Sequence, residues 1–439
     1  MKKNKITKIL LIILISILLC LVLIYFLTPK HLNKKYNPSK EENIIEEILK
    51  DNQEEKITKS FLMWLEKEYG KKKLTELKEE LNNKERVDWH QIYNNSLNVL
   101  LDTFNNTYSN MNNVKRIEKI TNTTELSFIG DVSLADNWYI IPKYEEREKN
   151  IYGILSEDVV DTLKNSNITI ANNEFTISNR GEKMPGKYYT FRASPERLKI
   201  YEEMGVDLVT LANNHVYDFG ADAFQDTIES LNEYQIPYIG AGRNLAEAMR
   251  PYYFIVNGYK IAFLNATRAE KLILTPEATE TSGGVFRCYN PNLLIEQIKK
   301  IKQDSDILIT LLHWGKEDSS NLEEVQIETA KQYIDAGSDL IVGTHAHTLQ
   351  GIDFYKEKAI IYNLGDFIFN NETKDTAIFQ LTIDNEKNFK YKIIPCQQRE
   401  EYTSIKSGIE KTRILDKLRT LSPNISIEEN GEFDLKSTN

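Results

Sequence analysis

The distribution of apolar and polar residues divides the chain into an apolar run, a charged helical region and a longer region of alternating short patterns. The apolar run covers residues 9–27, ILLIILISILLCLVLIYFL. With its edges it has about 20 residues, which at 1.5 Å rise per residue is enough to cross a hydrocarbon core ~30 Å thick. We therefore predict a transmembrane helix over residues 9–28, preceded by a short tail of residues 1–8.

The flanks of this run indicate an uncleaved signal anchor. A cleaved signal peptide usually has a shorter apolar core that ends in small residues, whereas Thr28, Pro29 and Lys30 follow this run. Cys20 lacks the preceding small residues that a lipoprotein cysteine usually has. Lysines are slightly more numerous before the run than after it, which favours an N-terminus inside the cell. We expect a single-pass protein of the cell membrane, with residues 1–8 cytoplasmic and the C-terminal domain extracytoplasmic.

Residues 29–120 form the second region, in which Glu and Lys are abundant and the pattern is helical. Apolar residues recur at helical spacing, among them Phe61, Leu62 and Leu65, and a second helical pattern runs from Trp89 to Thr107. We predict a helical stalk or a small helical subdomain. Two roles stay open for it: a solvated spacer that holds the main domain away from the membrane, and a module that docks a partner.

Short β-type runs alternate with helical patterns through most of the remaining chain. This alternation predicts an α/β domain with a largely central sheet, over residues 121–400. The predicted strands are residues 126–129, 168–171, 208–211, 259–265, 307–312, 340–342 and 359–362, with a hairpin over 377–383 and 389–394. The predicted helices are residues 156–165, 195–204, 221–234, 291–303 and 322–336. Residues 401–439 are expected to form a polar C-terminal tail, with a weak helix over 408–421 and loosely ordered chain from Pro423.

Composition excludes some classes of protein. Hydrophobic residues make up 41% of the chain, enough to bury a core, and the net charge of -10 argues against a nucleic-acid binder, which normally has a basic face. An anionic partner stays open, because a local basic pocket or a bound metal can outweigh the global charge. No Cys-x-x-Cys pair exists, which excludes a cysteine zinc site. For Cys288 and Cys396, two free thiols are favoured over a disulfide.

Histidine, carboxylate and amide side chains that could bind a ligand occur directly after the predicted strands. Four of the six histidines follow apolar runs in this way: His215, His313, His345 and His347. The acidic and amide residues Asp131, Glu174, Asn214 and Asp366 also follow such runs, Asn214 after the same run as His215. Ligand sites in open α/β sheets lie outside the carboxyl ends of the strands, so separate segments would deliver these side chains to one edge. Each residue alone is more often structural, but the combined set indicates a site.

The donor set suits a divalent metal such as Mn, Zn or Fe, because it combines histidine nitrogens with carboxylate and amide oxygens. In an extended segment His345 and His347 would point to the same side and could face one metal. Asp131 and Glu174 are the carboxylates that could bridge two ions, so one or two ions are expected. His215 is a candidate general acid or oxyanion stabiliser, since histidine titrates near neutrality.

Six motifs occur in order and carry a resemblance to a known family: FIGDV at 128–132, NE at 173–174, ANNHVYDFG at 212–220, HWGKE at 313–317, GTHAH at 343–347 and LGDF at 364–367. Together they resemble the CapA-type poly-γ-glutamate capsule-synthesis family. That family is similar in fold to calcineurin-like metallophosphoesterases. The resemblance implies a four-layer arrangement, in which helices flank a two-sheet β-sandwich.

The resemblance also implies roles for individual residues. Asp131, Glu174, Asn214, His313, His345 and His347 match metal-binding positions, and His215 matches the residue that assists the leaving group. Asp218 is expected either to orient His215 or to cap the helix that begins near Gly220. Asn213, Trp314, Glu317 and Asp366 are expected to support the ligands, to pack or to contact substrate. Two positions depart from the patterns: Ser133 stands where metallophosphoesterases place a histidine, and Asp366 stands where the capsule family commonly has asparagine.

The leading hypothesis is a metal-dependent hydrolase-like enzyme of the cell envelope that acts in capsule or poly-γ-glutamate biosynthesis, on an anionic polymer or its precursor. The alternative is a non-catalytic structural or export subunit of a membrane polymer synthase, with a cleft that still binds polymer or metal. The sequence leaves open which bond is broken, because poly-γ-glutamate contains amides whereas the related fold usually cleaves phosphoesters.

Overall fold

The computed structural model describes residues 59–83, 87–94, 96–97, 100, 113–117, 122–136, 138–146, 150–270 and 274–436. The predicted membrane helix, the tail before it and the first part of the helical region lie outside these residues. No helix in the described ranges is both long enough and apolar enough to cross a membrane. The chain divides into two units, residues 1–50 and 51–439, and all the elements below belong to the second.

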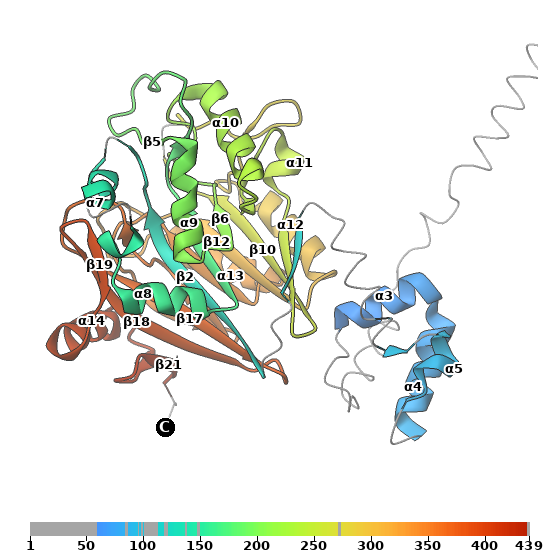
Figure 1. Ribbon diagram of the computed structural model, residues 1–439. Coiled ribbons are helices and arrows are strands. Elements are labelled where there is room, and N and C mark those ends of the chain that lie inside the picture. Colours follow the sequence, from blue (N-terminus) through green and yellow to red (C-terminus); the bar gives the residue numbers. More distant parts are fainter. Residues whose placement is uncertain are drawn as a thin grey trace, which may run out of the picture. The chain divides into compact units, whose positions relative to one another are not determined.

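Three helices build a small core near the start of the described chain: α3 (Lys59–Tyr69), α4 (Lys71–Asn83) and α5 (Trp89–Tyr93) (Figure 1). Gly70 separates α3 from α4 with a left-handed φ of 85°, which favours glycine. Phe61, Leu62 and Leu65 are fully buried, as their helical spacing predicts. The Trp89 ring stacks on Tyr93 with a centroid distance of 5.9 Å. The helical part of the prediction is confirmed for these residues.

Within the described residues of the main domain, the strands form two large sheets and two short pairs. The seven-stranded sheet has the order β1 (Val114–Ile117), β9 (Tyr252–Val256), β10 (Tyr259–Thr267), β12 (Ile307–His313), β13 (Leu340–Thr344), β15 (Lys358–Ile361), β14 (Ile352–Tyr355). The other sheet, ten-stranded, has the order β20 (Ile425–Ile427), β21 (Glu432–Leu435), β18 (Phe389–Arg399), β17 (Lys374–Asp384), β2 (Thr123–Val132), β3 (Ile168–Asn173), β6 (Leu208–Thr210), β7 (Tyr238–Ile239). Beside this path, β16 (Asp366–Ile368) pairs with β2 and β19 (Tyr402–Ile405) with β18. The short pairs are β8 (Ala241–Gly242) with β11 (Gly284–Val285), and β4 (Thr176–Ile177) with β5 (Arg192–Ala193).

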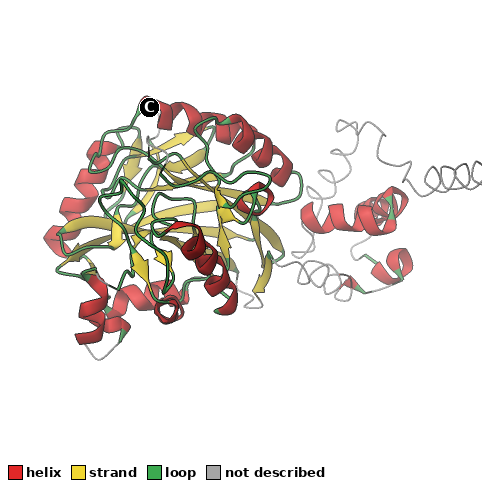
Figure 2. Cartoon of the chain, turned by 90° about the horizontal axis from the view of Figure 1, so that it is seen from above, coloured by secondary structure: helices red, strands yellow, loops and turns green. Residues whose placement is uncertain are grey.

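Helices cover the outer faces of both sheets (Figures 1 and 2). Against the ten-stranded sheet lie α7 (Ile140–Glu146), η1 (Ile151–Gly153), α8 (Glu157–Asn165), η2 (Pro195–Leu198), α9 (Lys199–Met204) and α10 (Gly220–Glu233). The seven-stranded sheet packs against α12 (Asn292–Lys302) and α13 (Glu324–Ala336). The remaining helices are α11 (Leu245–Ala248), beside β8, and α14 (Gly408–Leu421), beside β18. The result is four layers, helix–sheet–sheet–helix.

Strand periodicity explains this layering. Successive side chains of a strand point to opposite faces. Leu126 and Phe128 of β2 face the core between the two sheets, whereas Ile129 faces the core beneath the helices. Ile307 and Ile309 of β12 enter the same inter-sheet core from the other sheet. Parallel pairing of β2 with β3 and of β12 with β13 gives each sheet strands whose carboxyl ends share an edge.

Two regions differ from the sequence predictions. Val114–Ile117 pairs in parallel with β9, although a helical region was predicted to continue to residue 120. Loosely ordered chain was predicted from Pro423, but β20 and β21 form a hairpin that extends the ten-stranded sheet. Ile425, Ile427 and Phe433 are buried between polar neighbours. Strands this short alternate too briefly to stand out against a polar composition.

Candidate metal centre

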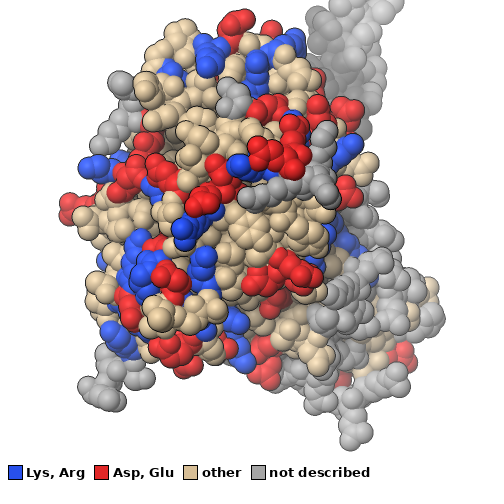
Figure 3. Space-filling view, turned by 60° about the vertical axis from the view of Figure 1, so that its left-hand side comes forward, with Lys and Arg blue, Asp and Glu red and all other residues tan. Residues whose placement is uncertain are grey.

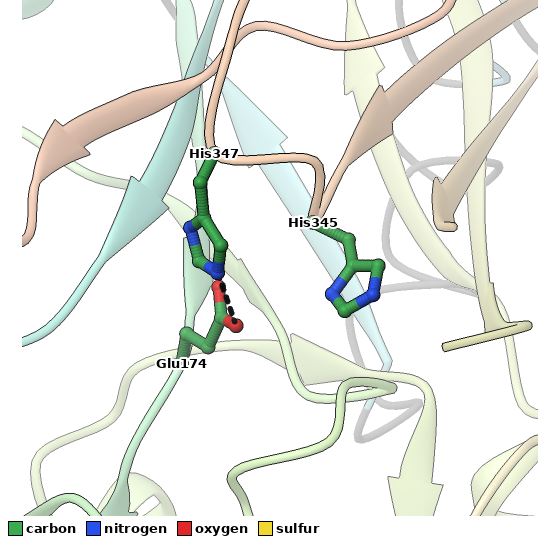
Figure 4. Close-up of side chains that lie close together, drawn as sticks. All are labelled: Glu174, His345 and His347. Carbon is green, nitrogen blue, oxygen red and sulfur yellow. Dashed lines mark ion pairs between the residues drawn. The ribbon is translucent and has the colours of Figure 1, made fainter. Parts of the chain in front are cut away.

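The predicted site residues converge at the carboxyl ends of the strands. Asp131 lies near the end of β2, Glu174 follows β3, His313 ends β12, and His345 and His347 follow β13. Asp366 begins β16, in register with Asp131. Their ligand atoms form three overlapping groups, in each of which all atoms lie within 4.8 Å of one another: Glu174, His345 and His347; Asp131, His347 and Asp366; Asp131, Glu174 and His313. Figure 4 shows the Glu174 carboxylate and the His347 ring pointing toward each other.

Asp131 holds the centre together. It is fully buried, and its carboxylate accepts hydrogen bonds from Asn172 Nδ2 at 2.8 Å and from the His345 backbone amide at 3.1 Å. His347 Nδ1 lies 3.6 Å from Asp131 Oδ2 and 2.6 Å from Asp366 Oδ1. Asp131 therefore connects strands of both sheets within one cluster.

One carboxylate oxygen of Glu174 is available to bind a metal. Asn172 Nδ2 donates to its Oε2 at 3.1 Å, but its Oε1 has no hydrogen-bond partner among the described residues. His313 Nε2 lies 3.5 Å from Oε1, and His347 Nε2 lies 4.0 Å away. His345 Nδ1, also buried, likewise lacks a hydrogen bond there. Because unpaired buried polar atoms are costly, these two atoms are well suited to bind a cation.

Asn214 joins the cluster through His313. Its Oδ1 lies 2.8 Å from His313 Nε2, and His313 Nδ1 lies 2.9 Å from Thr344 Oγ1. Asn213 contacts both the backbone and the cluster: its Oδ1 accepts from the amides of His215 and Val216 at 2.9 and 3.0 Å, and its Nδ2 donates to Asn172 Oδ1 at 3.2 Å. Asn213 therefore shapes the loop that presents its neighbours.

The backbone at His345 and His347 differs from the prediction. An extended segment was expected, but β13 ends at Thr344, and His345 and His347 have φ values of 96° and 53°. Left-handed backbone is unusual for histidine and is held here by the surrounding contacts. The two rings still lie in one cluster, with centroids 6.1 Å apart. The proximity was predicted correctly, but the geometric reason for it was wrong.

Burial and mutual repulsion dominate the electrostatics. Burial raises the pKa of Asp131 well above its ordinary value, and the neighbouring Glu174 adds to the rise. Burial also raises the pKa of Glu174, lowers the pKa of His313 to about 3 and lowers that of His345 well below its usual range. Burial alone would lower the pKa of His347, but the nearby carboxylates of Asp366, Glu174 and Asp131 together outweigh it and raise this pKa well above its ordinary value. A divalent cation would relieve the crowding of carboxylates and bind the neutral imidazoles of His313 and His345.

A second cluster forms around His215. His215 Nδ1 lies 2.7 Å from Asp218 Oδ2, and the Phe191 amide donates to the same oxygen at 2.8 Å. Lys187, whose side chain is buried, donates to Asp218 Oδ1 at 2.7 Å and to the carbonyl oxygen of Asn214. Of the two roles expected for Asp218, the structure thus favours orientation of His215 over helix capping.

Aromatic rings pack against His215 and His347. Phe191 lies 4.6 Å from His215 between ring centroids, and Phe369 lies 4.8 Å from His347. The two phenylalanines contact each other at 5.4 Å. They restrict the rotation of both imidazoles and keep water from one side of them.

The remaining predicted residues play different parts. Trp314 is buried and donates from Nε1 to the carbonyl oxygen of Tyr362 at 3.0 Å, which is a packing role. The half-exposed Glu317 lies 4.0 Å from His345 Nε2 at the rim. Ser133 is buried, and its hydroxyl has no hydrogen-bond partner among the described residues. Cys288 and Cys396 are both free and buried, as expected.

Sequence reasoning missed Asn172 and Lys187. Asn172 bonds to both Asp131 and Glu174, and its Oδ1 accepts from Thr210 Oγ1 at 2.9 Å. Its position two residues before Glu174, on the same face of an extended chain, was the available signal. Lys187 lies in a loop far from any predicted strand end, and no spacing rule points to it.

On the face in Figure 3, basic and acidic side chains are interspersed, and neither sign covers it.

A family of known proteins is similar to most of the main domain. Residues 125–371 match the family model described as bacterial capsule synthesis protein PGA_cap. The capsule biosynthesis protein CapA of Bacillus anthracis is 31% identical over 314 residues, which cover 69% of this chain and 73% of that protein. The PGA biosynthesis protein CapA of Bacillus subtilis (strain 168) is 27% identical over 281 residues, or 62% of this chain and 71% of that protein.

Solved structures give weaker matches. A hypothetical protein from Thermus thermophilus aligns with 63% of this chain at a TM-score of 0.39 and 14% identity, with all of that chain covered. A 5'-nucleotidase from Candida albicans aligns with 63% of this chain and 53% of its own, at a TM-score of 0.33 and 12% identity. Likeness at these scores says nothing about activity.

The family model covers more than half of the chain, and it spans every motif that supplies a residue to the cluster. On this match and the Bacillus anthracis relative, the chain belongs to the PGA_cap family of bacterial capsule synthesis proteins.

Proposed function

We propose that the protein is a metal-dependent hydrolase of the bacterial envelope that acts on an anionic capsule polymer, such as poly-γ-glutamate, or on its precursor. The convergence of buried carboxylates and neutral histidines from both sheets carries the proposal. Such an arrangement costs stability unless a cation compensates it, so it is better explained by metal binding than by packing. The relatives named for capsule and PGA biosynthesis support the choice of polymer.

The residues fit one or two ions of Mn, Zn or Fe. Asp131, Glu174, Asn214, His313, His345 and His347 would hold them, and Asp366 joins this set because it shares a ligand group with Asp131 and His347. When bound, a divalent ion supplies Lewis-acid polarisation of the substrate's oxygen and lowers the pKa of water. Oxygen and nitrogen donors without thiolate suit these metals.

The chain's own residues carry the proton chemistry. His215 donates a proton to the leaving group, and Asp218 holds the ring in the orientation that this transfer needs. Lys187 and the Phe191 amide fix the Asp218 carboxylate in turn. Phe191 and Phe369 limit the access of water to the two imidazoles that they contact.

The test uses the full chain, kept in solution with a mild detergent. Bound metal is measured, and phosphodiesters, phosphomonoesters and γ-glutamyl peptides are screened with added Mn or Zn. We expect the His345→Ala/His347→Ala double variant to keep the wild-type circular dichroism spectrum but to lose metal and more than about 100-fold in turnover. A wild-type protein that holds no metal and turns over no substrate would contradict the proposal. Metal binding without turnover would favour the non-catalytic synthase subunit, in which the packed helices α3–α5 could dock a partner.

The proposed location is the outer face of the cell membrane, with residues 9–28 as the anchor. Its support is the length of the apolar run, which suffices to cross a bilayer. A cysteine placed at Lys72, an exposed position of α4, is expected to react with a membrane-impermeant thiol reagent on whole cells. Cys288 and Cys396 provide little background because both are buried. If the new cysteine reacts only after the cells are lysed, the domain lies on the cytoplasmic side and the proposed orientation is wrong.

A further inference from the structure

A cavity of about 240 Å³ lies beside the His215 cluster. It is lined by Asp136, Ser178, Asn179, Lys183, Arg192 and Phe219. None of these residues belongs to the metal centre, and only Phe219 lies within one of the six sequence motifs. A cavity of this size holds a small polar group rather than a whole polymer unit with its neighbours.

The charges around the cavity leave an excess of positive charge. The one carboxylate in its lining, Asp136, is already paired: Arg197 Nε lies 2.6 Å from Oδ1, and the Ser194 amide donates to Oδ2 at 2.6 Å. Lys183 and Arg192 have no carboxylate within ion-pairing distance among the described residues. Two cations that are not neutralised by the protein therefore face one cavity.

Arg192 is held in place by neutral groups. Its NH1 donates to the carbonyl oxygens of Arg180 and Gly181, each at 3.1 Å, and its guanidinium lies 4.3 Å from the centre of the Phe219 ring. These contacts orient the guanidinium without cancelling its charge. A fixed, planar guanidinium is the group that best recognises carboxylate and phosphate.

Two lining residues directly follow residues of the His215 cluster. Arg192 follows Phe191, whose ring packs on His215. Phe219 follows Asp218, whose carboxylate bonds to His215. The amide of Met184, the residue after Lys183, donates to the carbonyl oxygen of Asp218 at 2.8 Å. The segments that line the cavity therefore contact the His215 cluster.

We propose that this cavity is a subsite for an oxyanion carried by the substrate, a carboxylate or a phosphate, next to the bond that is cleaved. Arg192 and Lys183 bind the oxyanion, and Asn179 and Ser178 border it. The proposal rests on the proposed function, because it takes His215 as the reacting end of the site. It explains how a protein with a net charge of -10 can bind an anionic polymer.

The experiment measures binding to the full-length, metal-loaded protein by titration calorimetry. The probes are an oligomer of γ-linked glutamate and an oligomer of glycerol phosphate, which separate the two sources of the oxyanion. We expect one of them to bind, with an affinity that falls as salt rises. Lys183→Glu is expected to weaken that binding by about 10-fold or more, because it reverses a charge at contact distance. Lys183 is exposed, so its replacement does not threaten the fold.

Lys300→Glu is the matched control, since Lys300 is an exposed lysine on α12, which covers the other sheet. It makes the same change in net charge and is expected to bind as the wild type does. Arg192→Gln provides a second variant, expected to weaken binding in the same direction. The subsite is wrong if Lys183→Glu and Lys300→Glu bind equally, or if neither oligomer binds the wild type. Turnover of a small chromogenic ester by the wild type tests the hydrolase separately, so either proposal can fail alone.

Discussion

Replacement of Asp131 by asparagine is expected to remove metal binding while leaving the fold in place. Asp131 takes part in two of the three ligand groups and receives hydrogen bonds from Asn172 and His345. Loss of residues that merely support a ligand typically costs about 10–100-fold in metal affinity, so loss of a charge shared by two groups should cost at least this much. Bound metal, measured after gel filtration, should fall from near stoichiometric to a small fraction, and turnover should fall with it.

The stability of this variant separates a ligand from a structural residue. Because burial raises the pKa of Asp131, the ionised carboxylate costs the metal-free protein stability at neutral pH. Asparagine removes that cost and can still accept the Asn172 bond, although it loses the longer bond from the His345 amide. The metal-free variant should therefore melt no lower than the metal-free wild type, but should lose the increase in melting temperature that added Mn or Zn gives the wild type. Asp161→Asn, at an exposed position of α8, is the control and should behave as wild type. If the Asp131→Asn variant binds metal with wild-type affinity, Asp131 is not a metal ligand.

The elements that position the site were predictable from the sequence because their residues obey strong periodic rules. The predicted strands over 126–129, 168–171, 307–312 and 340–342 all lie within β2, β3, β12 and β13. These strands are buried on both faces, so they read as apolar runs that end abruptly in polar residues. The site residues stand where these apolar runs end. The same pattern therefore predicted both the residues of the site and the sheet edge at which they lie.

Contacts made by loops were not predictable in this way. Lys187 reaches Asp218 from a loop that no periodic rule places, and Arg192 faces its cavity from a two-residue strand. The left-handed backbone at His345 is set by contacts from β2, since its amide donates to Asp131. Such features depend on the tertiary packing of distant segments, which a single sequence read locally does not contain.

Replacement of Gly130 by alanine is expected to disturb both the fold and the metal centre. A Cβ at this position would lie 1.8 Å from the carbonyl oxygen of Gly365 and 2.9 Å from its carbonyl carbon, so the backbone before β16 would have to move. That same carbonyl accepts the Asp131 amide at 3.0 Å, and the next residue, Asp366, pairs with His347. Overpacking against backbone should cost about 3 kcal/mol or more, at the upper end of values for inserted methyl groups. Thermal unfolding should show a drop of about 5 °C.

Gly220→Ala distinguishes this clash from a general effect of replacing glycine. Gly220 has a left-handed φ of 82°, but nothing lies within 4 Å of an added Cβ, so only the backbone penalty of about 1–2 kcal/mol applies. Gly130→Ala should therefore be the less stable variant. It alone should lose metal affinity, because only this substitution displaces the backbone next to Asp366. Equal stability and equal metal binding in the two variants would mean that β16 can yield without disturbing Asp131. In that case the close approach of Gly130 to Gly365 would not be what aligns the two aspartates, and their register would have to come from the pairing of β16 with β2 alone.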